Sequence, residues 1–190
     1  MMIMKFQAKF NPSQGGTETI GQFQKASGSK IAIAVDYSNV LKGIDFISSC
    51  TITAADLDGN DVTATIVEEF LTGNRVTGTA TGGSTSTLID TNTDFIAKGV
   101  TISDNIVNVT KGYRSAIASI ATQVADEPYS VLSFFDTNNL AAANSDTYHL
   151  FFCPVYIKAG TDGTDYEITF TMTANSGLVL TKKVLVNVVG

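Results

Sequence analysis

The clearest pattern of hydrophobic and polar positions lies near the end of the chain, in residues 166–173. Large apolar side chains alternate there with polar ones, namely Tyr166, Ile168, Phe170 and Met172 against Glu167, Thr169, Thr171 and Thr173. Because successive side chains of a strand point to opposite faces, this alternation predicts a half-buried β-strand. A turn sequence, Asn175-Ser-Gly177, separates it from a second apolar run that ends at Val189. We therefore predict a β-hairpin at the end of the chain.

Strand-like runs also occur before residue 76. They cover residues 31–35, 45–53 and 62–67, and turn sequences at Lys42-Gly43 and Asp58-Gly-Asn60 separate them. Residues 148–157 have the same texture. This regular spacing of short strands and turns is typical of a β-sandwich or a β-barrel.

Residues 76–135 are different, because short apolar pairs alternate there with Gly, Asp and Asn. Four or five brief strands are expected, enough for a small barrel. The stretch from Ser115 to Ala125 has a helical alternative, since Ile117, Ile120 and Val124 fall at helical spacing. Its β-branched residues favour a strand.

The pattern as a whole predicts an all-β protein in three parts. Residues 1–29, rich in Gly, Ser and Gln, form an N-terminal arm that frays or pairs with a neighbour, and Ile3 to Phe10 could add one strand. Residues 30–75 and 137–190 form a β-sandwich, and residues 76–136 form a small β-barrel-like domain inserted into it. Such an insertion costs little, because the entropy of loop closure rises only logarithmically with length.

Composition indicates which classes of binding partner are unfavourable for this chain. A formal net charge of −6 and scattered basic residues argue against binding to a phosphate backbone. Lys182-Lys183, the one adjacent basic pair, is expected to be solvated or to protect a strand edge. No apolar run approaches the roughly 20 residues of a membrane span, and the start of the chain lacks the order of a secretory signal. We expect a soluble protein made in a cytoplasm.

Cys50 and Cys153 are too few for a disulfide framework in a chain of this length. Both lie in apolar, strand-like surroundings, which favours two buried thiols that act as small hydrophobic residues. A bridge between them is the alternative. It requires Cα atoms within about 7 Å of each other.

Residues that carry chemistry are scarce. His149 is the only histidine, and as a general base it would need a carboxylate to orient it, so a structural or surface role is expected. Asp56-Leu-Asp-Gly-Asn-Asp61 resembles a calcium loop, but glycine is fourth and Val67 holds the twelfth position, which favours a hairpin turn. We therefore expect no enzyme activity, no metal site and no cofactor.

Two segments resemble known modules. Ala159 to Leu178, with a Gly-Thr-x-Gly-x-x-Tyr turn, is similar to the closing strands of immunoglobulin-like modules in structural proteins of tailed bacteriophages, and Val35 to Thr53 looks like their opening strands. The resemblance implies that the predicted sandwich is immunoglobulin-like. If Asp162, Gly163 and Tyr166 form a tyrosine corner, the Tyr166 hydroxyl bonds to nearby backbone; an ordinary core aromatic is the alternative.

The middle segment resembles small β modules of phage and prophage virion proteins, through Thr87 to Asp90, Asp94-Phe95, Gly99-Val100 and Asp104 to Asn108. Those modules carry Gly where this chain has Ser103. Together the resemblances imply a non-enzymatic virion protein that acts as a neck or tail adaptor. Its expected partners are tail, neck, fibre or capsid subunits and further copies of itself, with no nucleic acid and no membrane. A capsid decoration protein and a carbohydrate-binding surface module are the alternatives.

Overall fold

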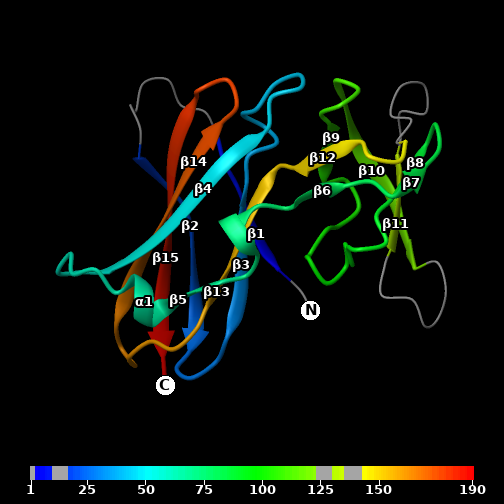
Figure 1. Cartoon of the computed structure of the whole chain (residues 1–190). Helices are drawn as coiled ribbons and strands as arrows, with labels where there is room; N and C mark the ends of the chain where they lie inside the picture. The colour runs from blue at the N-terminus through cyan, green and yellow to red at the C-terminus, as the bar shows by residue number, and fades with distance from the viewer. Residues whose placement is uncertain (1–2, 10–16, 123–129, 135–142) are drawn as a thin grey trace. The chain divides into compact units, whose positions relative to one another are not determined.

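A computed structural model describes residues 3–9, 17–122, 130–134 and 143–190. Nearly all of its regular structure is β-strand, which confirms the predicted all-β class (Figure 1). The chain divides into two compact units. Among the described residues, the sandwich unit comprises those within 3–41, 47–75 and 152–190, and the inserted unit comprises those within 42–46 and 76–151.

The sandwich unit consists of two four-stranded sheets. One, the β13 sheet, has the order β1 (Met4–Gln7), β3 (Ile31–Asp36), β13 (Phe152–Ile157), β5 (Val67–Glu69). The other, the β14 sheet, has the order β2 (Thr17–Ala26), β15 (Val179–Val189), β14 (Asp165–Ala174), β4 (Ile47–Asp56). Between β4 and the inserted unit lie two short helices, α1 (Thr63–Ile66) and the 3-10 turn η1 (Thr72–Asn74).

The strand order is that of an immunoglobulin domain. In chain order, β3, β4, β5, β13, β14 and β15 take the places of strands B, C, D, E, F and G. The neighbours are then B-E-D in one sheet and C-F-G in the other, as in immunoglobulin domains. The inserted unit interrupts the chain between strands D and E.

The alternation of apolar and polar residues in β14 determines which of its side chains enter the core of the sandwich unit. On β14 the apolar members of the pattern all face inward: Tyr166 is 5% exposed, and Ile168, Phe170 and Met172 are fully buried. β15 repeats the arrangement with Val184, Val186 and Val188. The predicted hairpin is confirmed by the antiparallel pairing of the two strands and by Gly177, whose φ of 88° suits a turn.

The predicted arm contributes strands to both sheets instead of hanging free. β1 pairs with β3 in parallel, and β2 pairs with β15 in parallel over most of its length. The pairing partner of Thr17 is Thr181, so local periodicity could not reveal the contact. Gly21 allows β2 to pass close to β1, because a Cβ there would collide with the Phe6 ring.

The Lys182-Lys183 pair also differs from expectation. β15 lies between β2 and β14 and is not an edge strand. The Lys182 side chain points inward, is 4% exposed as a residue, and its Nζ donates to Glu18 Oε2 at 2.9 Å. Lys183 lies on the opposite face and forms an ion pair with Glu167 at 2.5 Å.

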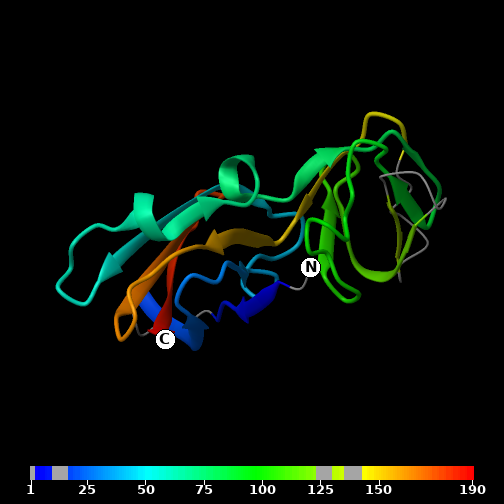
Figure 2. The ribbon, with the colours of Figure 1, turned by 90° about the horizontal axis from the view of Figure 1, so that it is seen from below.

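The inserted unit contains a seven-stranded sheet that curls into a half-barrel (Figure 2). Its strands are, in sheet order, β6 (Thr77–Thr79), β12 (Thr147–Leu150), β9 (Asn105–Asn108), β10 (Tyr113–Thr122), β11 (Ser130–Phe134), β8 (Thr87–Ile89) and β7 (Gly82–Gly83). Residues 113–122 form a strand, so the helical alternative is wrong there; residues 123–125 lie outside the described part of the chain. The long segment of the unit begins at Val76, where the sequence placed the start of the insertion, but it ends at Phe151 instead of 136, because β12 pairs with β6 and β9. Residues 42–46, which the sequence assigned to the sandwich, also belong to the inserted unit.

One core residue of the sandwich unit generates a stability prediction. Tyr37 is fully buried, and its hydroxyl has no hydrogen-bond partner among the described residues. An unpaired buried hydroxyl has lost its bonds to water without compensation. Tyr37→Phe should therefore leave the free energy of unfolding unchanged or raise it by up to about 1 kcal/mol, measured by chemical denaturation. A clear loss of stability would show that the hydroxyl is bonded in solution.

Candidate functional site

The outer face of the β14 sheet carries an unusual concentration of threonine. Because the apolar residues of β14 point inward, Thr169, Thr171 and Thr173 point outward, and the neighbouring strands continue the pattern. We call the following set the threonine face: Thr17, Thr19, Thr51, Thr53, Thr169, Thr171, Thr173 and Thr181.

The strand register places these threonines in rows across the sheet. Thr17, Thr181, Thr171 and Thr51 are successive partners on β2, β15, β14 and β4, which makes one unbroken row. The Oγ1 atoms of Thr171 and Thr181 lie 3.4 Å apart within hydrogen-bonding distance. The next row contains Thr19, Lys183, Thr169 and Thr53. The threonine face is therefore a regular two-dimensional array that spans every strand of the sheet.

Such an array differs physically from an ordinary solvated face. Threonine is β-branched, so its χ1 angle is restricted, and little side-chain entropy remains to be lost on binding. Each hydroxyl donates one hydrogen bond and accepts others. Lys183 is the only charged residue within the two rows, and it is paired with Glu167. The face is neutral, stiff and able to bond in both directions.

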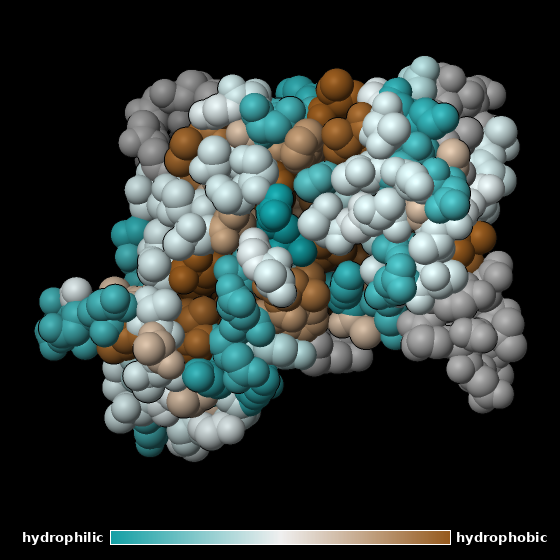
Figure 3. Space-filling view, viewed as in Figure 1, coloured by the Kyte–Doolittle hydropathy of each residue, from teal (hydrophilic) through white to brown (hydrophobic). Residues whose placement is uncertain are grey.

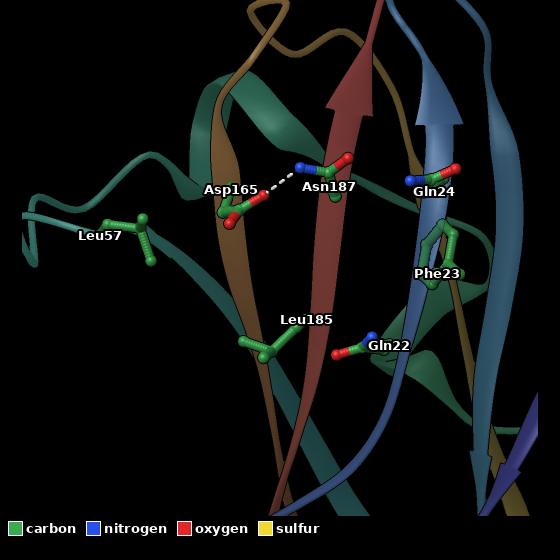
Figure 4. Close-up of a pocket in the computed structure, with 7 residues that line it drawn as sticks. All are labelled: Gln22, Phe23, Gln24, Leu57, Asp165, Leu185 and Asn187. Atoms are coloured by element: carbon green, nitrogen blue, oxygen red, sulfur yellow. Dashed lines mark hydrogen bonds between the residues drawn. The ribbon is translucent and has the colours of Figure 1, made fainter.

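A groove lies beyond the threonine face, toward the other end of the same outer surface (Figure 4). It has a volume of about 540 Å³. β2, β14 and β15 supply most of its lining, and Leu57 comes from the turn after β4. The lining residues are Gln22, Phe23, Gln24, Leu57, Asp165, Leu185 and Asn187.

The strand register also determines which lining residues of the groove lie next to each other. Gln24, Asn187 and Asp165 are successive cross-strand partners, and the Asn187 amide donates a hydrogen bond to the Asp165 carboxylate. Gln22 and Leu185 form the adjacent pair. Leu57 is 73% exposed and precedes a turn whose atoms are hydrophilic (Figure 3). Amide and carboxylate groups thus lie beside two aliphatic side chains, a combination suited to hydrogen-bonding ligands with an apolar part.

Tyr166 has the geometry of a tyrosine corner. It lies at the start of β14, and its hydroxyl accepts a hydrogen bond of 3.0 Å from the Thr161 backbone N–H. Burial raises the pKa of Tyr166, but hydrogen bonds with Thr161 and Thr164 outweigh burial and hold the pKa below its usual value. Gly163 has a φ of 73° and donates from its N–H to Val188 O, whereas Asp162 is exposed on the loop. These residues shape a loop and are not part of the groove.

The remaining residues singled out from the sequence have structural positions. Cys50 and Cys153 are buried, unbridged thiols on β4 and β13. His149 is 7% exposed and its ring lies against Phe46, with 4.4 Å between ring centroids. Asp56 accepts hydrogen bonds from Asn60 across a turn, and these bonds lower the pKa of Asp56. That turn contains Gly59 with a φ of 82°.

The inserted unit holds a buried polar cluster that sequence reasoning did not identify. Asp90, 2% exposed, accepts hydrogen bonds from the Tyr148 hydroxyl at 2.7 Å and from Thr93 Oγ1 at 3.0 Å. Lys98 Nζ donates to Thr93 at 3.1 Å. Burial raises the pKa of Tyr148 well above its usual value, so this hydroxyl remains a proton donor. The cluster joins the loop after β8 to β12.

Aspartates fix two other loops of the inserted unit. Asp104 accepts from the Thr101 N–H at 2.7 Å, and Asp146 accepts from Asn108 Nδ2 and from the Ala143 N–H, both at 2.9 Å. Ser103, where the resembling modules have Gly, adopts a φ of 73° beside Asp104. These carboxylates stabilise the turns by accepting hydrogen bonds from nearby groups, among them backbone N–H groups.

Within the described ranges, no group of three or more His, Cys, Asp or Glu side chains is arranged to hold a metal ion. In the same part of the chain, no helix is long and apolar enough to span a membrane.

The tyrosine corner predicts a specific cost for Tyr166→Phe. Loss of one hydrogen bond should lower the free energy of unfolding by about 1 kcal/mol, measured by chemical denaturation. The Thr161 amide should also exchange its hydrogen faster, because it loses its acceptor. An unchanged denaturation midpoint together with unchanged exchange at Thr161 would argue that Tyr166 is only a core aromatic.

The Asp90 cluster predicts a larger cost for Tyr148→Phe. This change removes a donor from a buried carboxylate and should destabilise the inserted unit by about 1–3 kcal/mol. Tyr113→Phe is the matched control, since Tyr113 belongs to the same unit and is 40% exposed. Equal denaturation curves for the two variants would contradict the structural role of the cluster.

Comparison with known proteins adds no relative: no protein-family model matches the chain, and no curated protein matches it.

Proposed function

We propose that this chain is a non-enzymatic structural component of a tailed-phage virion, acting as a neck or tail adaptor through protein–protein interfaces. The observation that carries the proposal is the outer face of the β14 sheet, where the threonine face and the groove form one continuous surface. The resemblance of residues 159–178 and 35–53 to phage immunoglobulin-like modules supports the virion setting.

The size of this surface suits an interface. Four strands about 4.8 Å apart and ten residues long cover about 600 Å², close to the roughly 800 Å² that each partner contributes to a standard complex. The strands hold the surface rigidly, so a partner meets a formed binding face and little ordering entropy is lost.

The chemistry of the surface also suits repeated contacts of modest strength. Stiff, neutral hydroxyl groups provide hydrogen bonds without the desolvation cost of charges. Exposed apolar residues lie at both ends, with Leu57 73% exposed and Val179 55% exposed. In a ring of identical subunits, many such contacts act together, and avidity makes the assembly stable even where each contact is weak.

Glycan binding is a second candidate, because one observation favours it. Gln22, Gln24, Asn187 and Asp165 bring amide and carboxylate groups to a groove that also contains Leu57 and Leu185. Sugar hydroxyls hydrogen-bond to such groups. The groove has no tryptophan, since the chain has none, so its apolar contact with a sugar ring rests on Leu57, Leu185 and Phe23.

Incorporation into particles tests the proposal. Phage particles from a host that carries this gene, purified by density gradient, should contain the chain at a fixed copy number by quantitative mass spectrometry. Supplied in trans to a deletion mutant, a chain with Thr51→Arg and Thr171→Arg should assemble poorly, because two bulky charges would stand in the middle of the threonine face.

The control is Thr65→Arg, an exposed position on α1 outside that face. It should assemble like the parent chain, and all variants should keep the parent unfolding temperature. Absence of the chain from purified particles would refute the proposal. Location in the capsid shell by labelling would assign it to capsid decoration, and binding of the free chain to a glycan array, abolished by Asn187→Ala, would favour the second candidate.

A further inference from the structure

The two cysteines face each other across the core of the sandwich unit. Cys50 is on the inner face of β4, and Cys153 is on β13 in the opposite sheet. Burial raises the pKa of Cys153 first, and the adjacent Cys50 thiol raises it further. The pKa of Tyr37 is raised by burial and then by both cysteines, so all three side chains share one region of the core.

This position differs from the usual disulfide of an immunoglobulin domain. That bridge joins strands B and F, with its second cysteine two residues after the corner tyrosine. Here the residue two positions after Tyr166 is Ile168, which is fully buried. Cys50 and Cys153 instead lie on the strands that correspond to C and E. A bridge between them would join the same two sheets at a different point.

A cavity borders one of the two cysteines. It has a volume of about 350 Å³ and lies beside Cys50, between β4 and the segment that contains α1, β5 and η1. Exposed residues, among them Ala64 and Gly73, line it, so it opens to solvent. Cys50 is 5% exposed and Cys153 is fully buried. Of the two cysteines, Cys50 is the one that lines the cavity, so we expect a small molecule in the cavity to reach Cys50 before Cys153.

The cavity wall also contains an unsatisfied polar atom. Asn74 is 7% exposed and lines the cavity; its Nδ2 donates to Cys50 O at 3.4 Å, while its Oδ1 has no hydrogen-bond partner among the residues described. Asn74 adopts a φ of 51°, a left-handed conformation that asparagine tolerates better than most residues other than glycine. A small hydroxylic molecule beside Cys50 would satisfy Oδ1 as a hydrogen-bond donor.

We propose that Cys50 and Cys153 are an oxidative modification site, at which a small peroxide converts the two thiols into a disulfide that links the sheets. This inference goes beyond the proposed function and does not depend on it. It requires no second protein chain.

The reaction balances in two steps. The Cys50 sulfur attacks one oxygen of hydrogen peroxide, and the O–O bond breaks. The other oxygen departs as water with the Cys50 proton, and Cys50 becomes a sulfenic acid. The Cys153 sulfur then attacks the Cys50 sulfur; an S–S bond forms, the S–O bond breaks, and the hydroxide leaves as water with the Cys153 proton. Together the sulfurs lose two electrons and peroxide gains them. Because the raised pKa keeps Cys153 protonated, the second step should be slow and should accelerate as pH rises.

The test is oxidation of the folded full chain with hydrogen peroxide, followed by denaturation and alkylation with iodoacetamide. The oxidised protein should be two hydrogen atoms lighter than the reduced protein, should take up no alkyl group and should yield a linked peptide pair containing Cys50 and Cys153. Its unfolding temperature should rise by about 5 °C or more, since the bridge closes a long loop. Reducing agent should reverse both changes.

Matched variants test the access route. Cys50→Ser and Cys153→Ser should each show no rise in unfolding temperature on oxidation. Ala64→Leu, which fills the cavity, should slow bridge formation several-fold, whereas Thr65→Leu, on the same helix but outside the lining of this cavity, should not. Two alkylatable thiols after peroxide treatment of the folded parent chain, or a disulfide-linked dimer in place of the internal bridge, would overturn the inference.

Discussion

The pairing of β14 with β15 on one side and β4 on the other is the interaction on which the sandwich unit depends. It runs along nearly the whole of β14 on both sides. From Tyr166 to Met172 the inward side chains of this central strand are large and apolar, so register and burial enforce each other. A slip of one residue would turn Phe170 and Met172 to solvent and bury threonines. The cost of that exchange fixes the strand in its place.

The same constraint creates the outer surface. Because alternate residues of β14 are buried in the core, the polar residues between them must face outward. The pairing register aligns these polar residues with threonines of the three other strands. The threonine face is therefore a direct consequence of the strand pairing, not a separate feature. Its rows, its stiffness and its continuity with the groove all follow from the positions that the core assigns to the backbone.

The sequence predicted the elements whose information is local. The β14–β15 hairpin was visible because Tyr166, Ile168, Phe170 and Met172 alternate without a break, and the start of the inserted unit at Val76 was visible as a change of texture. A strand within Ile3 to Phe10 was expected, but β2 and the partners of both strands were not visible, because β1 and β2 pair in parallel with strands that no local pattern connects to them. The end of the inserted unit was misplaced for the same reason: β12 resembles a sandwich strand until its partners β6 and β9 are known.

The candidate site was only partly visible in the sequence. The repeated Thr-x-Thr pattern at residues 17–19, 51–53 and 169–173 was present, but its meaning required the register that places those segments side by side. The position of Cys50 opposite Cys153 could not be predicted, because it depends on how the two sheets of the sandwich pack against each other. Asp90 and Tyr148 are separated by many residues and meet only through the curvature of the inserted sheet.

A density map of the assembled particle, at a resolution that shows side chains, would reveal whether this outer surface is an interface. We expect the outer face of the β14 sheet, from the row containing Thr171 to the groove at Leu57, to be covered by another virion subunit or a further copy of this chain. A map in which that face is exposed to solvent, while another surface of the chain holds it in the particle, would contradict the account.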